Sequence, residues 1–196
     1  MNAANLVMAD LEDAIQALEA ARGSPKDVRR AFSRFVDLTQ RLTSVMRTEF
    51  YRTTGGKWNA RSFTGWNNVT AFFKWLRNHE QHDSPIRISV HERRFYEVPG
   101  FSGRVFPFEG TWVLADQLDD DLPDGITFTP IDQATGAPLP PVEPVRVEYQ
   151  YLIQWPSEES QLLLQAIGTT DVHQLSADCI AVLRDYHAHY ISVLGT

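Results

Sequence analysis

Apolar residues recur every three to four positions over the first part of the chain, which is the spacing that buries one face of an α-helix. The pattern predicts helices over residues 4–22, about 27–51 and 66–82. Each predicted helix stops where glycine or proline follows, because neither residue continues a helix readily. These stops lie at residues 23–25, 53–56 and 83–85.

The pattern changes after the third predicted helix, where short segments rich in β-branched and aromatic residues alternate with turns of proline, glycine and aspartate. Such segments predict strands. They lie at residues 86–98, 104–115, 125–131 and 145–153. Residues 132–144 hold four prolines and predict a loop. Helical spacing returns from Ser157, breaks at Gly168 and resumes after an Asp171 cap.

These elements predict an α+β fold, in which an antiparallel helical bundle carries a β-rich insertion between its third helix and its C-terminal helices. We expect a single domain over residues 1–196, since a chain of this length fits one domain with an insertion. The bundle would comprise residues 4–84 and 157–194, and the insertion residues 86–155. Apolar residues make up 43% of the chain, which is ordinary for a protein that buries a core.

Charge is distributed unevenly along the chain, although the net charge is −7. Residues 1–46 hold 6 basic and 6 acidic side chains, residues 47–104 hold 10 and 5, and residues 105–196 hold 2 and 14. The basic middle segment could meet a polyanion, which the acidic remainder would repel. Alternatively, the basic segment neutralises the acidic remainder inside one chain or a dimer.

The single cysteine, Cys179, lies in an apolar helical pattern, so we expect a buried free thiol, which fits a reducing compartment. The N-terminus carries acids where a signal peptide would be basic. No apolar run approaches the roughly 20 residues that a membrane span needs. We therefore expect a soluble, cytoplasmic protein with no membrane association.

One stretch carries side chains suited to chemistry, at the end of the third predicted helix, which reads FFKWLRNHEQHDSP. Within it, Arg77, Asn78 and His82 form the pattern R-N-x-x-x-H. A histidine can accept a proton from a ribose 2′-hydroxyl or donate one to the leaving 5′-oxygen. A guanidinium can hold the phosphate as negative charge builds on it. The asparagine can orient either group by a hydrogen bond.

The pattern resembles the motif of ribonucleases in the HEPN superfamily (higher eukaryotes and prokaryotes nucleotide-binding), and the helical segments resemble its bundle. The resemblance implies a HEPN-like, metal-independent endoribonuclease without a cofactor, in which Arg77, Asn78 and His82 are catalytic. It further implies an RNA substrate, a homodimer in which two motifs meet, a toxin–antitoxin or defence role, and a regulatory protein partner. The β-rich insertion departs from a minimal bundle of this family. The alternative is a non-catalytic HEPN-like module that binds a partner protein or a nucleotide.

A second copy of the looser motif occurs at residues 184–189, which read RDYHAH. It lies within a predicted helix without glycine or proline, where residues five apart point roughly 140° away from each other. His82, by contrast, precedes the stop at residues 83–85, where the backbone can turn. Residues 77–82 also lie in the basic segment, so we interpret them as the functional copy.

Structural roles compete with the catalytic ones. His82 could cap the helix end by donating to its last carbonyls, and Arg77 could pair with Glu80 on the surface. His79 lies near the apolar stripe, which favours a partly buried structural histidine. His187 and His189 diverge on a helix, so they make a poor metal pair.

Aromatic and basic residues alternate just before the third predicted helix, with Lys57 and Arg61 among Trp58, Phe63 and Trp66. Stacking combined with positive charge is how proteins hold single-stranded nucleic acid, so Lys57, Arg61 and the helix residue Lys74 are predicted RNA-binding residues. The alternative for the aromatic residues is loop packing.

Other common sites are not indicated. The sequence holds no glycine-rich phosphate loop, no nucleophilic serine elbow and no zinc-type cysteine cluster. We therefore predict no metal site.

Overall fold

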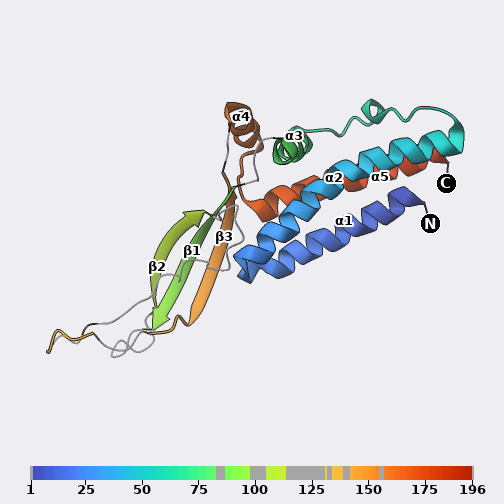
Figure 1. Ribbon diagram of the computed structural model, residues 1–196. Helices are drawn as coiled ribbons and strands as arrows, with labels where there is room; N and C mark the ends of the chain where they lie inside the picture. The colour runs from blue at the N-terminus through green and yellow to red at the C-terminus, as the bar shows by residue number, and fades with distance from the viewer. Residues whose placement is uncertain are drawn as a thin grey trace.

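The computed structural model describes residues 2–82, 87–97, 105–113, 131, 134–138, 142–154 and 157–195. This part of the chain forms five α-helices, with an antiparallel three-stranded sheet inserted between the third and fourth (Figure 1). The predicted α+β architecture is therefore confirmed. The elements are α1 Ala3–Ala20, η1 Ala21–Gly23, α2 Pro25–Thr54, η2 Ala60–Ser62, α3 Asn68–His82, β1 Ile88–Glu97, β2 Val105–Val113, β3 Arg146–Ile153, α4 Glu158–Ile167 and α5 Val172–Leu194.

Local capping explains where the helices begin and end. Ser24 caps α2 by accepting from the Asp27 N–H, and Gly55 ends it with a left-handed φ of 71°. The apolar pattern predicts that the third helix begins at Trp66. In the structure it begins at Asn68. Asn67 is the reason, because its Oδ1 accepts from the Thr70 N–H at 3.2 Å and so starts the helix there.

Three long helices, α1, α2 and α5, run alongside one another, and α3 crosses over α2 and α5 (Figure 1). Phe73 anchors this crossing. It is 1% exposed, and its ring meets those of Phe32 and Phe35 edge-on, with centroid distances of 6.0 and 5.5 Å. Such aromatic pairs add specific geometry to the burial of apolar surface, so Phe73 fixes where α3 lies on α2.

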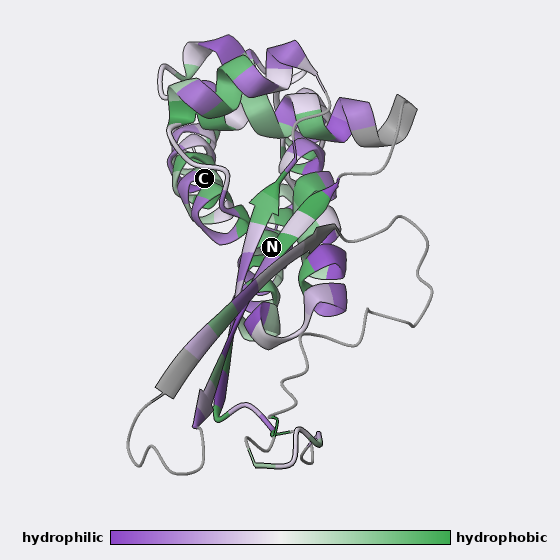
Figure 2. Ribbon diagram, turned by 90° about the vertical axis from the view of Figure 1, so that its left-hand side faces the viewer, coloured by the Kyte–Doolittle hydropathy of each residue, from purple (hydrophilic) through white to green (hydrophobic). Residues whose placement is uncertain are grey.

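The sheet has the strand order β2-β1-β3, with both pairs antiparallel. It extends away from the helices, and Figure 2 shows the apolar colouring concentrated where the strands meet the bundle. Ile88, Val90, Tyr151 and Ile153 at this base are buried in the same core as the helices. The base of the insertion therefore shares its hydrophobic core with the bundle.

Hydrogen bonds hold the base of the sheet in place. The hydroxyl of Tyr151 donates to the carbonyl of Arg22 at 2.8 Å, at the turn between α1 and α2. The N–H of Ile153 donates to the carbonyl of Thr170 at 2.8 Å, just before α5. These contacts join β3 to segments more than a hundred residues earlier and seventeen residues later in the chain.

The predicted strand at residues 125–131 lies outside the described residues, apart from Ile131, which forms an isolated bridge with Pro138. The expected C-terminal helices are confirmed, with the break at Gly168 and the Asp171 cap. No helix in the described ranges is long and apolar enough to cross a membrane.

We expect Phe35→Ala to lower the free energy of unfolding by about 3–5 kcal/mol, because it removes a fully buried ring that contacts Phe73. Urea denaturation measures the change. The control is Leu6→Ala on α1, where the side chain is 52% exposed and the change should stay within about 0.5 kcal/mol. Equal effects of the two substitutions would contradict the assigned core.

Two histidines should make stability depend on pH. Burial lowers the pKa of His173 below its usual 6.5, with a further contribution from the Arg22 charge, and burial likewise lowers the pKa of His187. The unfolded chain therefore binds protons more readily than the folded one, so the free energy of unfolding falls as the pH drops below about 6.5. Carboxylates whose pKa is lowered, such as that of Glu19, contribute only at more acidic pH.

Urea denaturation at about pH 7.5 and about pH 5.5 tests this dependence. The double variant His173→Gln/His187→Gln should lose less stability between the two pH values than the parent protein does. An unchanged difference would assign the pH dependence to other groups.

Candidate functional site

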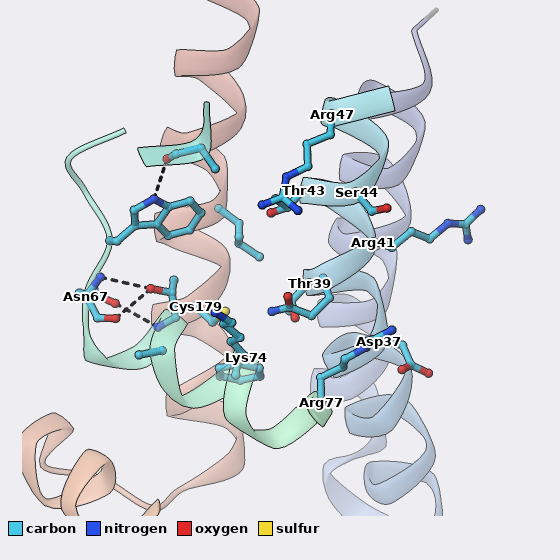
Figure 3. Close-up of a pocket in the computed structure, with 17 residues that line it drawn as sticks. Asp37, Thr39, Arg41, Thr43, Ser44, Arg47, Asn67, Lys74, Arg77 and Cys179 are labelled. Atoms are coloured by element: carbon cyan, nitrogen blue, oxygen red, sulfur yellow. Dashed lines mark hydrogen bonds between the residues drawn. The ribbon is translucent and has the colours of Figure 1, made fainter. Parts of the chain in front are cut away.

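A groove lies over α5, enclosed by α2, by α3 and by the loop of residues 55–67 (Figure 3). Its volume is about 850 Å³, within the usual range for ligand sites. Helix α2 supplies one wall, α3 crosses the base, and the loop supplies the opposite wall. The lining residues are Asp37, Thr39, Gln40, Arg41, Thr43, Ser44, Arg47, Ala60, Trp66, Asn67, Thr70, Ala71, Phe73, Lys74, Arg77, Cys179 and Leu183.

The lining is strongly basic. It includes four cationic side chains, those of Arg41, Arg47, Lys74 and Arg77, and one acidic side chain, that of Asp37. Figure 3 shows Arg47 reaching from α2 into the groove, whereas Arg41 points away from α3. Lys74 and Arg77 lie three residues apart on α3, so they face the same side of that helix.

None of these four cations forms an ion pair or a hydrogen bond with any residue in the described part of the chain. Arg184, by contrast, is neutralised by donating to both oxygens of Glu12. Some arginines outside the groove, such as Arg34, Arg52 and Arg87, also form no ion pair with a described residue, so the distinctive feature of the groove is that its cations lie together. Like charges held together in a concave surface produce a positive potential that attracts anions. The groove is therefore suited to an anionic ligand.

Hydroxyl groups line the α2 wall beside these cations. Ser44 is exposed beside Arg41 and Arg47, so its hydroxyl is able to donate to a ligand. Thr39 is buried and already donates to the Val36 carbonyl at 2.7 Å, so its proton is not available to a phosphate. Hydroxyls and guanidinium groups together are the usual contacts to phosphate oxygens. The polar half of the groove thus has the composition of a phosphate-binding surface.

The loop wall is held by aromatic packing on Tyr186 of α5. Trp58 donates its indole N–H to the Tyr186 hydroxyl at 2.7 Å and is only 7% exposed. Phe63 and Trp66 lie against the same ring, at centroid distances of 5.4 and 4.4 Å. Burial raises the pKa of Tyr186, so its hydroxyl stays protonated.

The predicted catalytic residues all lie on the last two turns of α3. Arg77 is half-buried and lines the groove, whereas Asn78 is exposed and is not among the lining residues. Helix α3 runs without a break through Arg77 to its last residue, His82, so these two residues lie five apart on one helix, as Arg184 and His189 do on α5. The side chain of His82 lies outside the described part of the structure. Arg77 therefore lies in the groove. That His82 acts together with it stays a prediction.

The predicted RNA-binding residues are divided between two places. Lys74 lines the groove, while Lys57 and Arg61 are exposed on the loop and are not among the lining residues. Of the neighbouring aromatic residues, Trp58 packs in the interior, in agreement with the loop-packing alternative. Trp66 both packs on Tyr186 and lines the groove, where it remains 37% exposed.

The second motif copy has structural roles. Arg184 is paired with Glu12, and His189 lies 3.1 Å from the Ser62 hydroxyl and packs on Trp58 and Phe63. These contacts agree with the interpretation of residues 184–189 as an accidental match. His79 stacks on Trp75 at 4.9 Å and is partly buried, as expected for a structural histidine.

The sequence reasoning missed the contribution of α2. Ser44 and Arg47 lie three residues apart, which places them on one side of a helix, whereas Arg41, six residues before Arg47, lies about 120° around it. This spacing was visible in the sequence, but nothing local indicated that α3 would lie opposite it.

Cys179 lines the floor of the groove as a buried free thiol, as predicted. Burial raises the pKa of this thiol, so it is not a thiolate nucleophile at neutral pH. Among the residues that the structure describes, no group of three or more histidine, cysteine, aspartate and glutamate side chains could hold a metal ion.

Comparison with known proteins does not assign the chain, because no family model, curated protein or solved structure matches it.

Replacing the groove cations should weaken the binding of inorganic polyphosphate, an anion without bases. Arg47→Ala and Lys74→Ala should each lower the affinity by roughly 2- to 10-fold and reduce the salt dependence, because each removes about one phosphate contact. Fluorescence competition at several salt concentrations measures both quantities.

The control is Arg30→Ala, which removes an exposed cation near the start of α2, paired with Asp27 at 3.8 Å and outside the groove. It should leave the affinity within about twofold. An equal loss in all three variants would point to the overall charge and not to the groove.

Proposed function

We propose that this protein is a HEPN-like, metal-independent endoribonuclease that acts as a homodimer. The observation that carries the proposal is the position of Arg77, half-buried in a groove whose cations have no ion-pair partner in the described residues. Structural arginines are normally paired when partly buried. A half-buried guanidinium beside Lys74, without a carboxylate partner among the described residues, has the character of a phosphate-binding group.

The proposed chemistry uses the ribose as its own nucleophile. His82 takes the proton from the 2′-hydroxyl, the 2′-oxygen bonds to phosphorus, and the 5′-oxygen leaves with a proton. The products are a 2′,3′-cyclic phosphate and a 5′-hydroxyl end. Arg77 stabilises the charge that builds on the phosphoryl oxygens, and Asn78 orients one of the reacting groups.

The homodimer supplies the second proton-transfer group. A single His82 can act as a base or as an acid, but not as both in one step, whereas two motifs that meet provide one of each. Residues five apart on a helix point to different sides of it, and α3 includes both Arg77 and His82, so the two side chains of one chain do not share a site. The resemblance to HEPN ribonucleases supports the dimer, and with it the toxin–antitoxin or defence role and a regulatory protein partner.

Cleavage of a labelled single-stranded RNA in the presence of a chelator tests the proposal. Arg77→Ala and His82→Ala should each lower the rate by at least 100-fold, since each removes charge stabilisation or proton transfer. Replacing the ribose at the cleaved position by deoxyribose should abolish cleavage, because the nucleophile is then absent.

The matched control is Arg184→Ala, which alters the arginine of the second motif and should leave the rate unchanged. Equal activity in all preparations would point to a contaminant and contradict the proposal. Absence of cleavage, with polyphosphate binding retained, would favour the non-catalytic alternative that binds a nucleotide or a partner. Sedimentation of the active fraction distinguishes a dimer from a monomer.

A further inference from the structure

Trp66 differs from the other aromatic residues of its loop in being both rigidly held and open to the groove. Its indole N–H donates to the carbonyl of Ala60 at 2.9 Å. Its ring lies 4.4 Å from that of Tyr186 and meets Phe63 edge-on at 5.2 Å. Even so, 37% of the side chain is exposed, compared with 7% for Trp58.

This combination restricts what Trp66 can offer a ligand. Because its only hydrogen-bond donor is already used by Ala60, the side chain can contribute only its aromatic surface. A ring held by three contacts loses little conformational freedom when a second flat group lies against it. Stacking of a planar group is therefore the interaction that this position favours.

The surroundings of Trp66 select the kind of planar group. Trp66 shares the groove with Arg47, Lys74 and Arg77, so the ligand must join a flat ring to several negative charges. Asn67 lies beside it, with its Oδ1 occupied by the Thr70 N–H and its side-chain amide N–H groups still able to donate. A nucleic-acid strand has this combination of bases and phosphates.

We infer that Trp66 forms a nucleobase-stacking subsite for single-stranded RNA, separated along α3 from the phosphate position at Arg77. The inference rests on the proposed ribonuclease function and adds the strandedness of its substrate. Bases in a duplex already stack on one another, so only an unpaired base can lie against the indole. The subsite tolerates any base, because every base has an aromatic face.

The length of α3 sets the spacing between the two positions. Helix α3 begins at Asn68, two residues after Trp66, and at 1.5 Å per residue Arg77 lies about 14 Å further along the helix. A stacked strand covers this distance in about four nucleotides at roughly 3.4 Å each, and a more extended strand in fewer. Substrates shorter than this span cannot occupy both positions together.

The experiment measures the affinity for an uncleavable 2′-deoxy hexanucleotide and for inorganic polyphosphate. Trp66→Leu retains apolar contact with Tyr186 but offers no aromatic face, so it should bind the hexanucleotide about 5- to 100-fold more weakly. The affinity for polyphosphate should change by less than about twofold, since the cations remain. Trp66→Phe keeps a flat ring and should retain most of the affinity for the hexanucleotide.

Two controls separate stacking from loss of structure. Trp75→Phe alters a tryptophan that stacks between Phe72 and His79 and does not line the groove, so it should leave both affinities unchanged. The affinity for polyphosphate is the second control, because it depends on the groove cations and not on the indole ring. The inference is overturned if Trp66→Leu binds the hexanucleotide as tightly as the parent does. It is also overturned if the affinity of this variant for polyphosphate falls as much as its affinity for the hexanucleotide.

The outcomes also separate this inference from the proposed function. Cleavage that depends on Arg77 and His82 but not on Trp66 would overturn the subsite and leave the ribonuclease. Binding that depends on Trp66, without any cleavage, would retain the subsite and overturn the ribonuclease.

Discussion

The packing of one loop on Tyr186 determines the shape of the candidate site. The bond from Trp58 to the Tyr186 hydroxyl joins residues 128 positions apart, and Phe63 and Trp66 pack on the same ring. Together these contacts hold the loop of residues 55–67 against α5 and bring the chain back to the point where Asn67 starts α3. The loop wall, the start of α3 and the base of the groove all follow from this arrangement.

The groove brings together cations that have no carboxylate partner among the described residues. Arg22, Arg93 and Arg184 lie within bonding distance of carboxylates, so their charges are locally balanced. Arg47, Lys74 and Arg77 are not balanced in this way by any described residue, although the chain as a whole is acidic. Concentrating uncompensated positive charge in a concavity disfavours the isolated fold, which is why such an arrangement points to a ligand and not to packing.

The sequence was most informative where a local signal sets the structure. The glycines at the end of α2 and the Asp171 cap at the start of α5 marked those boundaries closely, and alternating β-branched residues located the three described strands. The start of α3 was misplaced because Trp66 continued the apolar pattern while the Asn67 cap decided the boundary. Lys74 and Arg77 could be predicted as site residues from the sequence of one helix alone. The contribution of Arg47 and the exposure of Trp66 to the groove could not, because both depend on how α2, α3 and the loop approach one another.

Unbalanced cations couple the folding equilibrium to the composition of the solution. Any anion that binds the groove of the native state, and not the unfolded chain, raises the apparent stability in proportion to the logarithm of its concentration. A phosphate buffer and a chloride buffer at equal ionic strength are then thermodynamically different solvents for this protein. Melting temperatures report on substitutions at Arg47, Lys74 or Arg77 only when the anion is held constant, because the substitutions also alter this linkage.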